Sequence, residues 1–144
     1  GLLIEHADAA MATLCTRITR AEDYRSPHVV KVVSDAAGRA LYFSRAPIPA
    51  AGHTGAGPAG GDGGFPVSAR HIGLYAYRIG ALRALAVSPP CYLEQCENLE
   101  QLRAMWMGLE IRIAQAIEPH GPDIDTPEDL QRALEFMRST GMSA

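Results

Sequence analysis

The stretch VVKVVSDAAGRALYFS, residues 29–44, decides the fold, because it contains the clearest pair of adjacent β-strands in the chain. Val29–Ser34 and Ala40–Ser44 are rich in β-branched and aromatic residues, which favour strands. Between them, Asp35-Ala36-Ala37-Gly38 has the composition of a tight turn whose final glycine can take positive φ. We therefore expect a β-hairpin.

The segments on both sides of the hairpin predict further strands and helices. Before it, we expect the end of a helix over Gly1–Ala10, a buried strand over Met11–Ile18 and a polar connection over Arg20–Pro27. After it, we expect strands over His71–Tyr77 and Ile111–Ile117, and helices over Gly80–Val87, Leu93–Met107 and from Thr126 to about Gly141. This order predicts an α/β fold in which a mixed sheet carries flanking helices.

Two of these helices show an apolar stripe that predicts which side faces the core. In the helix over Leu93–Met107, the stripe is formed by Tyr92, Leu99, Leu102 and Trp106. In the C-terminal helix, the stripe is formed by Leu130, Ala133, Leu134 and Met137.

The chain fits one domain, or a large piece of one, over residues 1–144. Residues 47–69 are so rich in glycine and proline that burial of apolar surface cannot offset their ordering entropy, and we expect a flexible loop there. The loop does not divide two complete domains.

Charge and cysteine content exclude several classes of function. A net charge of −3 gives no reason to expect nucleic acid or an anionic membrane as a partner. The 3 cysteines are odd in number and lack paired CxxC spacing, which indicates reduced thiols in a cytoplasmic protein. No apolar run approaches the roughly 20 residues that span a bilayer.

The helix start near Thr126 is the first place where chemistry can be sought. Thr126 suits the N-cap and Pro127 the first helical position, so Asp125 lies just before the cap, where ligands commonly bind in α/β sheets. Asp125 is either a carboxylate favoured by the helix dipole or an oxygen ligand for Mg²⁺. A magnesium site needs a second carboxylate, which spacing does not identify.

A second group of polar residues lies on the expected strand over His71–Tyr77. Alternation places His71, Gly73, Tyr75 and Tyr77 on one face, which either lines a pocket or packs in the interior.

The remaining polar candidates lie elsewhere in the sequence. Glu100 and Arg103 could form a solvated pair on their helix, with Gln101 beside them. Arg45, at the end of the hairpin, has the forked geometry that binds carboxylates or phosphates, or it is an ordinary surface arginine.

Five motifs in this order resemble the CMP-Kdo synthetases, the 3-deoxy-manno-octulosonate cytidylyltransferases. They are Val30-Lys31-Val32-Val33, residues 40–49 (ALYFSRAPIP), residues 71–78 (HIGLYAYR), Leu99-Glu100-Gln101-Leu102-Arg103 and residues 125–130 (DTPEDL). The resemblance implies the C-terminal part of a nucleotide-diphospho-sugar-transferase-like, Rossmann-like sheet, here the sugar-binding and dimerisation half.

This resemblance also implies an activity and a set of site residues. Such enzymes transfer CMP from CTP to the sugar acid Kdo with release of pyrophosphate, in lipopolysaccharide biosynthesis. The implied substrate-binding residues are Arg45, which meets the sugar carboxylate, and His71, Tyr75, Glu100 and Gln101. Asp125 is implied as the catalytic magnesium ligand, and a cytoplasmic homodimer as the assembly.

Family members also carry a basic loop that contains glycine and proline and binds CTP, and a Gly-Asp segment that supplies another magnesium ligand. Neither has a counterpart in these 144 residues, so we expect this chain alone to be inactive. The alternative is a non-catalytic sugar-binding or dimerisation module, a truncated paralogue. The stretch Pro49-Ala50-Ala51-Gly52-His53, which departs from the family pattern, favours that alternative.

Overall fold

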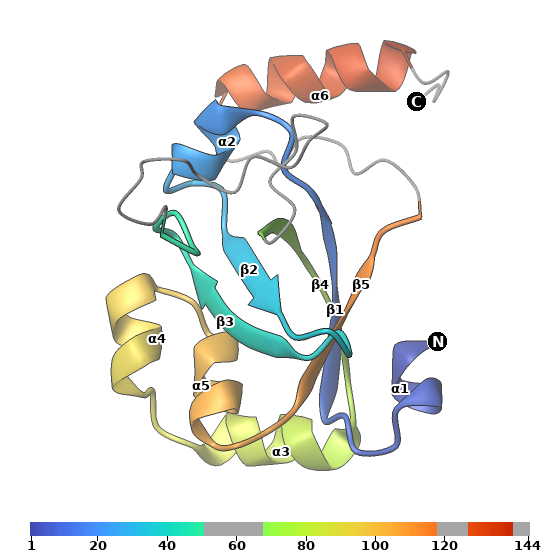
Figure 1. The fold of residues 1–144 in the computed structure, drawn as a ribbon, viewed down its shortest axis with the longest axis vertical. Helices are drawn as coiled ribbons and strands as arrows, with labels where there is room; N and C mark the ends of the chain where they lie inside the picture. Colours follow the sequence, from blue (N-terminus) through green and yellow to red (C-terminus); the bar gives the residue numbers. More distant parts are fainter. Residues whose placement is uncertain (51–67, 118–126, 140–144) are drawn as a thin grey trace.

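The fold is built on one mixed β-sheet, seen in the computed structural model, which describes residues 1–50, 68–117 and 127–139. Its strands are β1 (Met11–Arg17), β2 (Lys31–Ser34), β3 (Ala40–Ser44), β4 (Ala69–Tyr77) and β5 (Ile111–Gln115). They lie in the order β3-β2-β4-β1-β5 (Figure 1), with β1 and β5 parallel and the other neighbours antiparallel. The predicted α/β fold with a mixed sheet is confirmed.

Helices pack against the lower part of the sheet in Figure 1: α3 (Ile79–Val87), α4 (Tyr92–Glu97) and α5 (Gln101–Trp106). The buried core joins strand side chains to these helices. Its members are Met11, Val32, Phe43, Leu85, Leu99, Leu102, Ala104 and Ile111. The helix α6 (Pro127–Ser139) lies at the opposite end of the molecule from α3.

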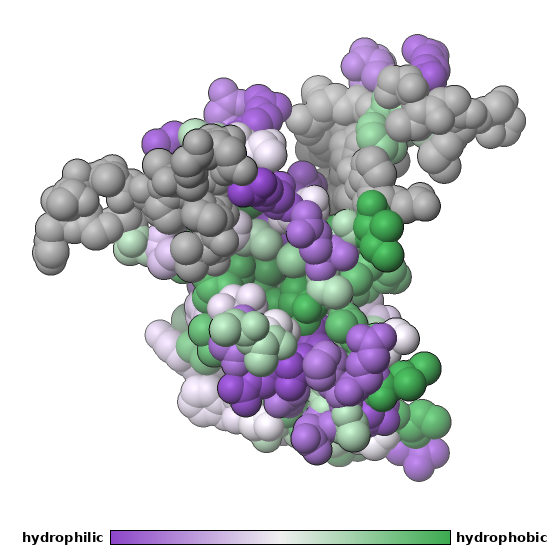
Figure 2. Space-filling view, turned by 45° about the vertical axis from the view of Figure 1, so that its right-hand side comes forward, coloured by the Kyte–Doolittle hydropathy of each residue, from purple (hydrophilic) through white to green (hydrophobic). Residues whose placement is uncertain are grey.

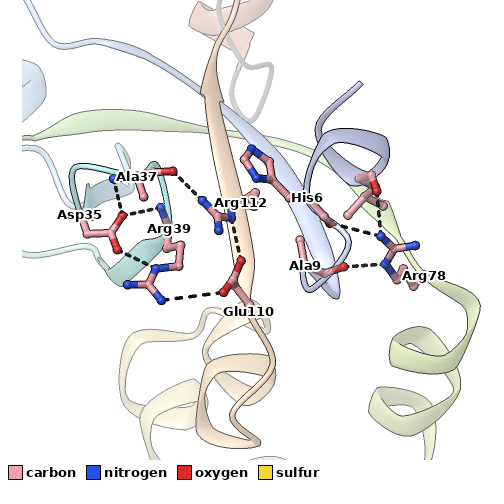
Figure 3. A network of polar contacts seen from close by, with 9 residues as sticks. His6, Ala9, Asp35, Ala37, Arg39, Arg78, Glu110 and Arg112 are labelled. Carbon is pink, nitrogen blue, oxygen red and sulfur yellow. Dashed lines mark hydrogen bonds and ion pairs between the residues drawn. The ribbon is translucent and has the colours of Figure 1, made fainter.

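The predicted hairpin is confirmed, and its turn packs against β5. Gly38 has a φ of 76°, which other residues rarely adopt, and a Cβ there would lie 3.2 Å from the Ile113 carbonyl oxygen. Both the backbone conformation and the space therefore favour glycine at this position. Figure 3 shows how side chains fasten the turn: Asp35 accepts from Arg39, and Arg112 contacts both Glu110 and the Ala37 carbonyl. To the right of β5 in Figure 3, Arg78, which directly follows β4, donates to the backbone carbonyls of Leu3, His6 and Ala9, before β1.

The single helix predicted over Leu93–Met107 is wrong, because α4 ends at Glu97 and α5 begins at Gln101. Asn98 takes a left-handed conformation with φ 53° and ψ 51°, and asparagine tolerates this better than most residues. Leu99 and Leu102 are buried as the predicted stripe requires. Its outer members, Tyr92 and Trp106, are 72% and 63% exposed, so the predicted stripe does not continue across the break.

Other differences from the predicted elements are smaller. The expected polar connection over Arg20–Pro27 contains a short helix, α2 (Ala21–Arg25), which buries Tyr24. The helix expected over Gly1–Ala10 is reduced to α1 (Leu2–Glu5), and β5 stops two residues short of the fully exposed Ile117.

The C-terminal helix is present as α6, and Ala133 on its predicted stripe is buried. Leu130 and Leu134 on the same stripe are nearly half exposed. Asp125, Thr126 and Gly141 lie outside the described residues, and so do residues 51–67 of the expected loop. Across the described ranges, every helix is too short or too polar to cross a membrane.

One face of the sheet carries a wide apolar hollow of about 850 Å³. It lies beside α1 and is lined by sheet side chains that include Ala12, Leu14, Ile72 and Leu74. Figure 2 likewise shows hydrophobic surface across the middle of the molecule, above a band of hydrophilic residues. The described part of the sheet therefore has one face packed by helices and one open apolar face.

Candidate functional site

A smaller and more polar cavity lies between β4, α3 and α5, with a volume of about 350 Å³. Its polar lining is formed by Tyr75, Tyr77, Glu100, Gln101 and Arg103, and its apolar lining by Met11, Leu82, Leu85 and Ala86. Three of the predicted site residues, Tyr75, Glu100 and Gln101, thus share one cavity although β4 and α5 are far apart in sequence.

A bulge in β4 shapes the strand side of this cavity. Thr13 of β1 pairs with Tyr75, whereas the next residue, Leu14, pairs with Ile72, so β4 holds two additional residues there. An insertion of two residues preserves the alternation of side chains, and the rings of His71 and Tyr75 stay neighbours at 5.2 Å. The face predicted from alternation is therefore present, with a bulge that the alternation did not predict.

The Thr13 hydroxyl holds the bulge together. This side chain is buried, and its oxygen lies 3.0 Å from the Ile72 carbonyl, 2.9 Å from the Leu74 carbonyl and 3.0 Å from His71 Nε2. A hydroxyl has one proton, so it donates to one of these acceptors at a time; when it donates to a carbonyl it accepts from His71 Nε2, and the contact holds the ring beside Tyr75.

The Tyr75 hydroxyl is a buried polar group with no hydrogen-bond partner among the described residues. Burial raises its pKa far above the ordinary value, with the neighbouring Tyr77 and Glu100 adding to the effect. Thr13 is near enough to oppose that rise, but its own bonds run to Ile72, Leu74 and His71. Tyr75 is therefore a neutral phenol whose donor and acceptor are both unused among the described residues.

Glu100 and Gln101 enter the cavity from the start of α5. Glu100 is exposed and directly precedes the helix, and Gln101 is its buried first residue. The predicted pairing of Glu100 with Arg103 is wrong, because Arg103 Nε lies 3.2 Å from Glu94 and Arg103 Nη1 donates to the Ser88 carbonyl. The Glu100 carboxylate is thus left facing the cavity.

His71 and Arg45 do not line the cavity. The His71 ring lies further along β4, next to the Tyr75 ring, and it meets the Phe43 ring edge-on with 5.1 Å between the ring centroids. Arg45 follows β3, and its guanidinium donates to the backbone carbonyls of Pro27, Glu97 and Asn98. The structure therefore places His71 beside the cavity and Arg45 behind the turn that precedes α5.

The predicted metal ligand, Asp125, lies outside the described residues. Within the described ranges, no group of three or more His, Cys, Asp or Glu side chains converges as a metal site would require. The magnesium role of Asp125 stays a prediction.

Sequence reasoning missed three residues that support the site: Thr13, Lys31 and Glu97. Lys31 is fully buried, and the available signal was a lone lysine inside the apolar run Val29–Val33. Thr13 and Glu97 gave no comparable signal, since their partners lie more than 50 residues away in sequence.

Together these groups suit a ligand rich in hydroxyls. A carboxylate, a primary amide, two phenols and the Arg103 side chain line a cavity whose remaining walls are apolar, and the polar groups can each bond a hydroxyl in a fixed direction.

Comparison with known proteins shows similarity over most of the chain. Proteins named 3-deoxy-manno-octulosonate cytidylyltransferase from Alkalilimnicola ehrlichii, Thioalkalivibrio sulfidiphilus and Xanthomonas euvesicatoria are 46%, 47% and 48% identical to it. The matches cover 99%, 95% and 91% of this chain but 55%, 54% and 51% of those proteins. The chain therefore spans about half the length of the curated relatives it matches.

A solved structure shows the same fold. It is described as CMP:2-keto-3-deoxy-manno-octonic acid synthetase complexed with CTP, and it matches with a TM-score of 0.80 at 35% identity over 96% of this chain and 53% of that one. The family model for cytidylyltransferases matches residues 3–111. The chain belongs to the cytidylyltransferase family.

Proposed function

We propose that this chain supplies the sugar-acid side of a cytidylyltransferase that transfers CMP from CTP to Kdo and releases pyrophosphate. Its relatives bear the name of that enzyme, and a solved structure of the same fold is described as holding CTP. The relatives' remaining half has no match in these 144 residues, so the isolated chain is proposed to bind the sugar without completing the transfer.

The observation that carries the proposal is the buried Tyr75 hydroxyl, which has no partner among the described residues and belongs to a cavity shared with Glu100 and Gln101. A buried polar group that lacks a hydrogen bond costs about 1–3 kcal/mol, and a sugar hydroxyl would remove that cost. In this proposal Tyr75, Glu100 and Gln101 bond hydroxyls of Kdo, and His71 fixes the Tyr75 ring.

We also propose three further features of the complete enzyme. Asp125 is proposed to hold Mg²⁺, which when bound draws a phosphate and an attacking hydroxyl together and offsets their charge. Pairing into a homodimer and a cytoplasmic location are proposed from the resemblance alone.

Calorimetric titration with Kdo tests the proposal. The wild-type chain is expected to bind, and Tyr75→Phe to bind roughly twofold to tenfold more weakly, which matches the net contribution of one hydrogen bond. Because Tyr75→Phe removes a buried polar group with no partner in the described part of the chain, the free energy of unfolding of this variant should be unchanged or higher. Tyr92→Phe, at an exposed tyrosine outside the cavity, is the matched control.

Two results would count against the proposal: no Kdo binding by the folded wild-type chain, or equal binding by Tyr75→Phe. Separately, incubation with CTP, Kdo and Mg²⁺ should yield no CMP-Kdo. Turnover by the 144 residues would refute the part of the proposal that concerns inactivity.

The open apolar hollow favours a second candidate, a non-catalytic module that pairs with another polypeptide. An apolar sheet face of this size is normally covered by a further layer. Pairing in a size measurement without Kdo binding would favour this second candidate.

A further inference from the structure

Residues at the end of β3 form hydrogen bonds with the turn that connects α4 to α5. The Ser44 hydroxyl donates to Glu97 Oε1 at 2.6 Å, and the Arg45 backbone N–H donates to Glu97 Oε2 at 2.9 Å. Both oxygens of this carboxylate are therefore bound from the strand, by one buried side chain and one backbone group.

The Arg45 side chain adds hydrogen bonds to backbone carbonyls of this turn. Its Nε donates to the Glu97 carbonyl at 2.9 Å, while Nη2 reaches the Asn98 carbonyl at 3.4 Å and Nη1 the Pro27 carbonyl at 3.1 Å. From beneath, the buried Lys31 ammonium donates to the Arg45 carbonyl. Three of the five N–H donors of the guanidinium thus bond carbonyls at the end of α4 and near α2.

The turn held in this way leads directly into the cavity. Asn98 adopts its left-handed conformation immediately after Glu97, and Glu100 and Gln101 follow two and three residues later. Leu99 and Leu102, which flank Glu100 and Gln101 in sequence, are both buried in the core, so this short path is anchored on both sides. A change at Asn98 would therefore move both polar side chains of α5 that line the cavity.

We propose that Arg45 is a positioning residue: it fixes the turn at Glu97 and Asn98 so that Glu100 and Gln101 face the ligand, and it does not itself contact the sugar carboxylate. This inference rests on the proposed function for the identity of the ligand. It replaces the direct role in carboxylate binding that the family resemblance implied for Arg45.

Titration of two ligands into the wild type and two variants separates positioning from contact. Kdo and its uncharged C1 amide are titrated into the wild-type chain and into Arg45→Met, with Arg83→Met, at an exposed arginine of α3, as the control. Positioning weakens both ligands by the same factor, within about twofold. Direct contact would weaken the acid by roughly tenfold or more beyond the amide, as loss of a charge-assisted bond does, and that result would overturn the proposal.

Hydrogen exchange without ligand tests the positioning step independently of sugar binding. Amides of residues 98–103 in Arg45→Met should exchange at least about fivefold faster than in the wild type, whereas amides of β4 should not change. Ser44→Ala, a milder change, should also raise the exchange rates of the same amides, by a smaller factor. Unchanged exchange in both variants would overturn the inference, even if Kdo binds.

If the folded wild-type chain fails to bind Kdo while exchange rises as expected, the proposed function falls and the positioning of residues 98–103 by Arg45 stands.

Discussion

Replacement of Lys31 by methionine probes the support beneath the site. Lys31 is fully buried, and its ammonium donates to the carbonyls of Ser26 at 2.7 Å, Val29 at 2.5 Å and Arg45 at 2.5 Å. Three acceptors match the three protons of an ammonium group, so its donor capacity is filled. Methionine fills a similar volume and donates nothing.

The expected cost follows from the surroundings of the three carbonyls. The Val29 carbonyl bond is buried, and loss of its donor costs about 1–3 kcal/mol. The bonds to Ser26 and Arg45 are partly buried, so water can replace the ammonium there and each loss costs about 0.5–1 kcal/mol. Relief from burying a charge offsets part of this sum, and we expect a net loss of about 2–3 kcal/mol.

Urea unfolding, followed by circular dichroism, measures this loss as a shift of the midpoint by roughly 1–2 M. Arg83→Met is the control, because an exposed arginine should change the free energy of unfolding by less than about 0.5 kcal/mol. A loss of under about 1 kcal/mol for Lys31→Met would refute the reasoning, since it would show that the desolvation of the ammonium cancels its three hydrogen bonds.

Two further changes test the bulge and the hairpin. Thr13→Val should lower the free energy of unfolding by about 1–3 kcal/mol and weaken Kdo binding. Thr13→Ser should lose only about 1 kcal/mol and keep the affinity, because its hydroxyl can still donate to a β4 carbonyl. Equal loss of affinity in calorimetry of both variants would contradict this. Hydrogen bonds from Arg39, first from its backbone N–H and second from its side chain, lower the pKa of the Asp35 carboxyl. Ionised Asp35 therefore stabilises the fold above about pH 4, and this stabilisation is lost as the pH falls through the lowered pKa. Urea unfolding should therefore show the advantage of the wild type over Asp35→Asn shrinking from pH 6 to pH 3, and a constant difference would count against it.

The hairpin over residues 29–44 was predictable because its information is local. Strand-forming runs flank a turn that ends in Gly38, and the structure has both strands and the positive φ. Alternation along β4 likewise placed His71 and Tyr75 on one face, since the two additional residues of the bulge leave the alternation intact.

Features that depend on distant partners were not predictable. The apolar spacing across Leu93–Met107 continues through Asn98, so periodicity did not reveal a break that Arg45 stabilises from β3. The pairing of Arg103 with Glu94 was missed for the same reason, because a continuous helix would have placed Glu100 nearer. Local patterns thus identified the cavity residues Tyr75, Glu100 and Gln101, while the contacts that orient them came only from the fold.

A crystal structure of this chain with Kdo tests the central claim most directly, namely that the cavity between β4 and α5 binds the sugar acid. The account predicts Kdo in that cavity, with one of its hydroxyls about 3 Å from the Tyr75 hydroxyl and others near Glu100 and Gln101. It also predicts that the Arg45 guanidinium stays on the Glu97 and Asn98 carbonyls. Kdo bound elsewhere, with the Tyr75 hydroxyl still unpaired, would contradict the account.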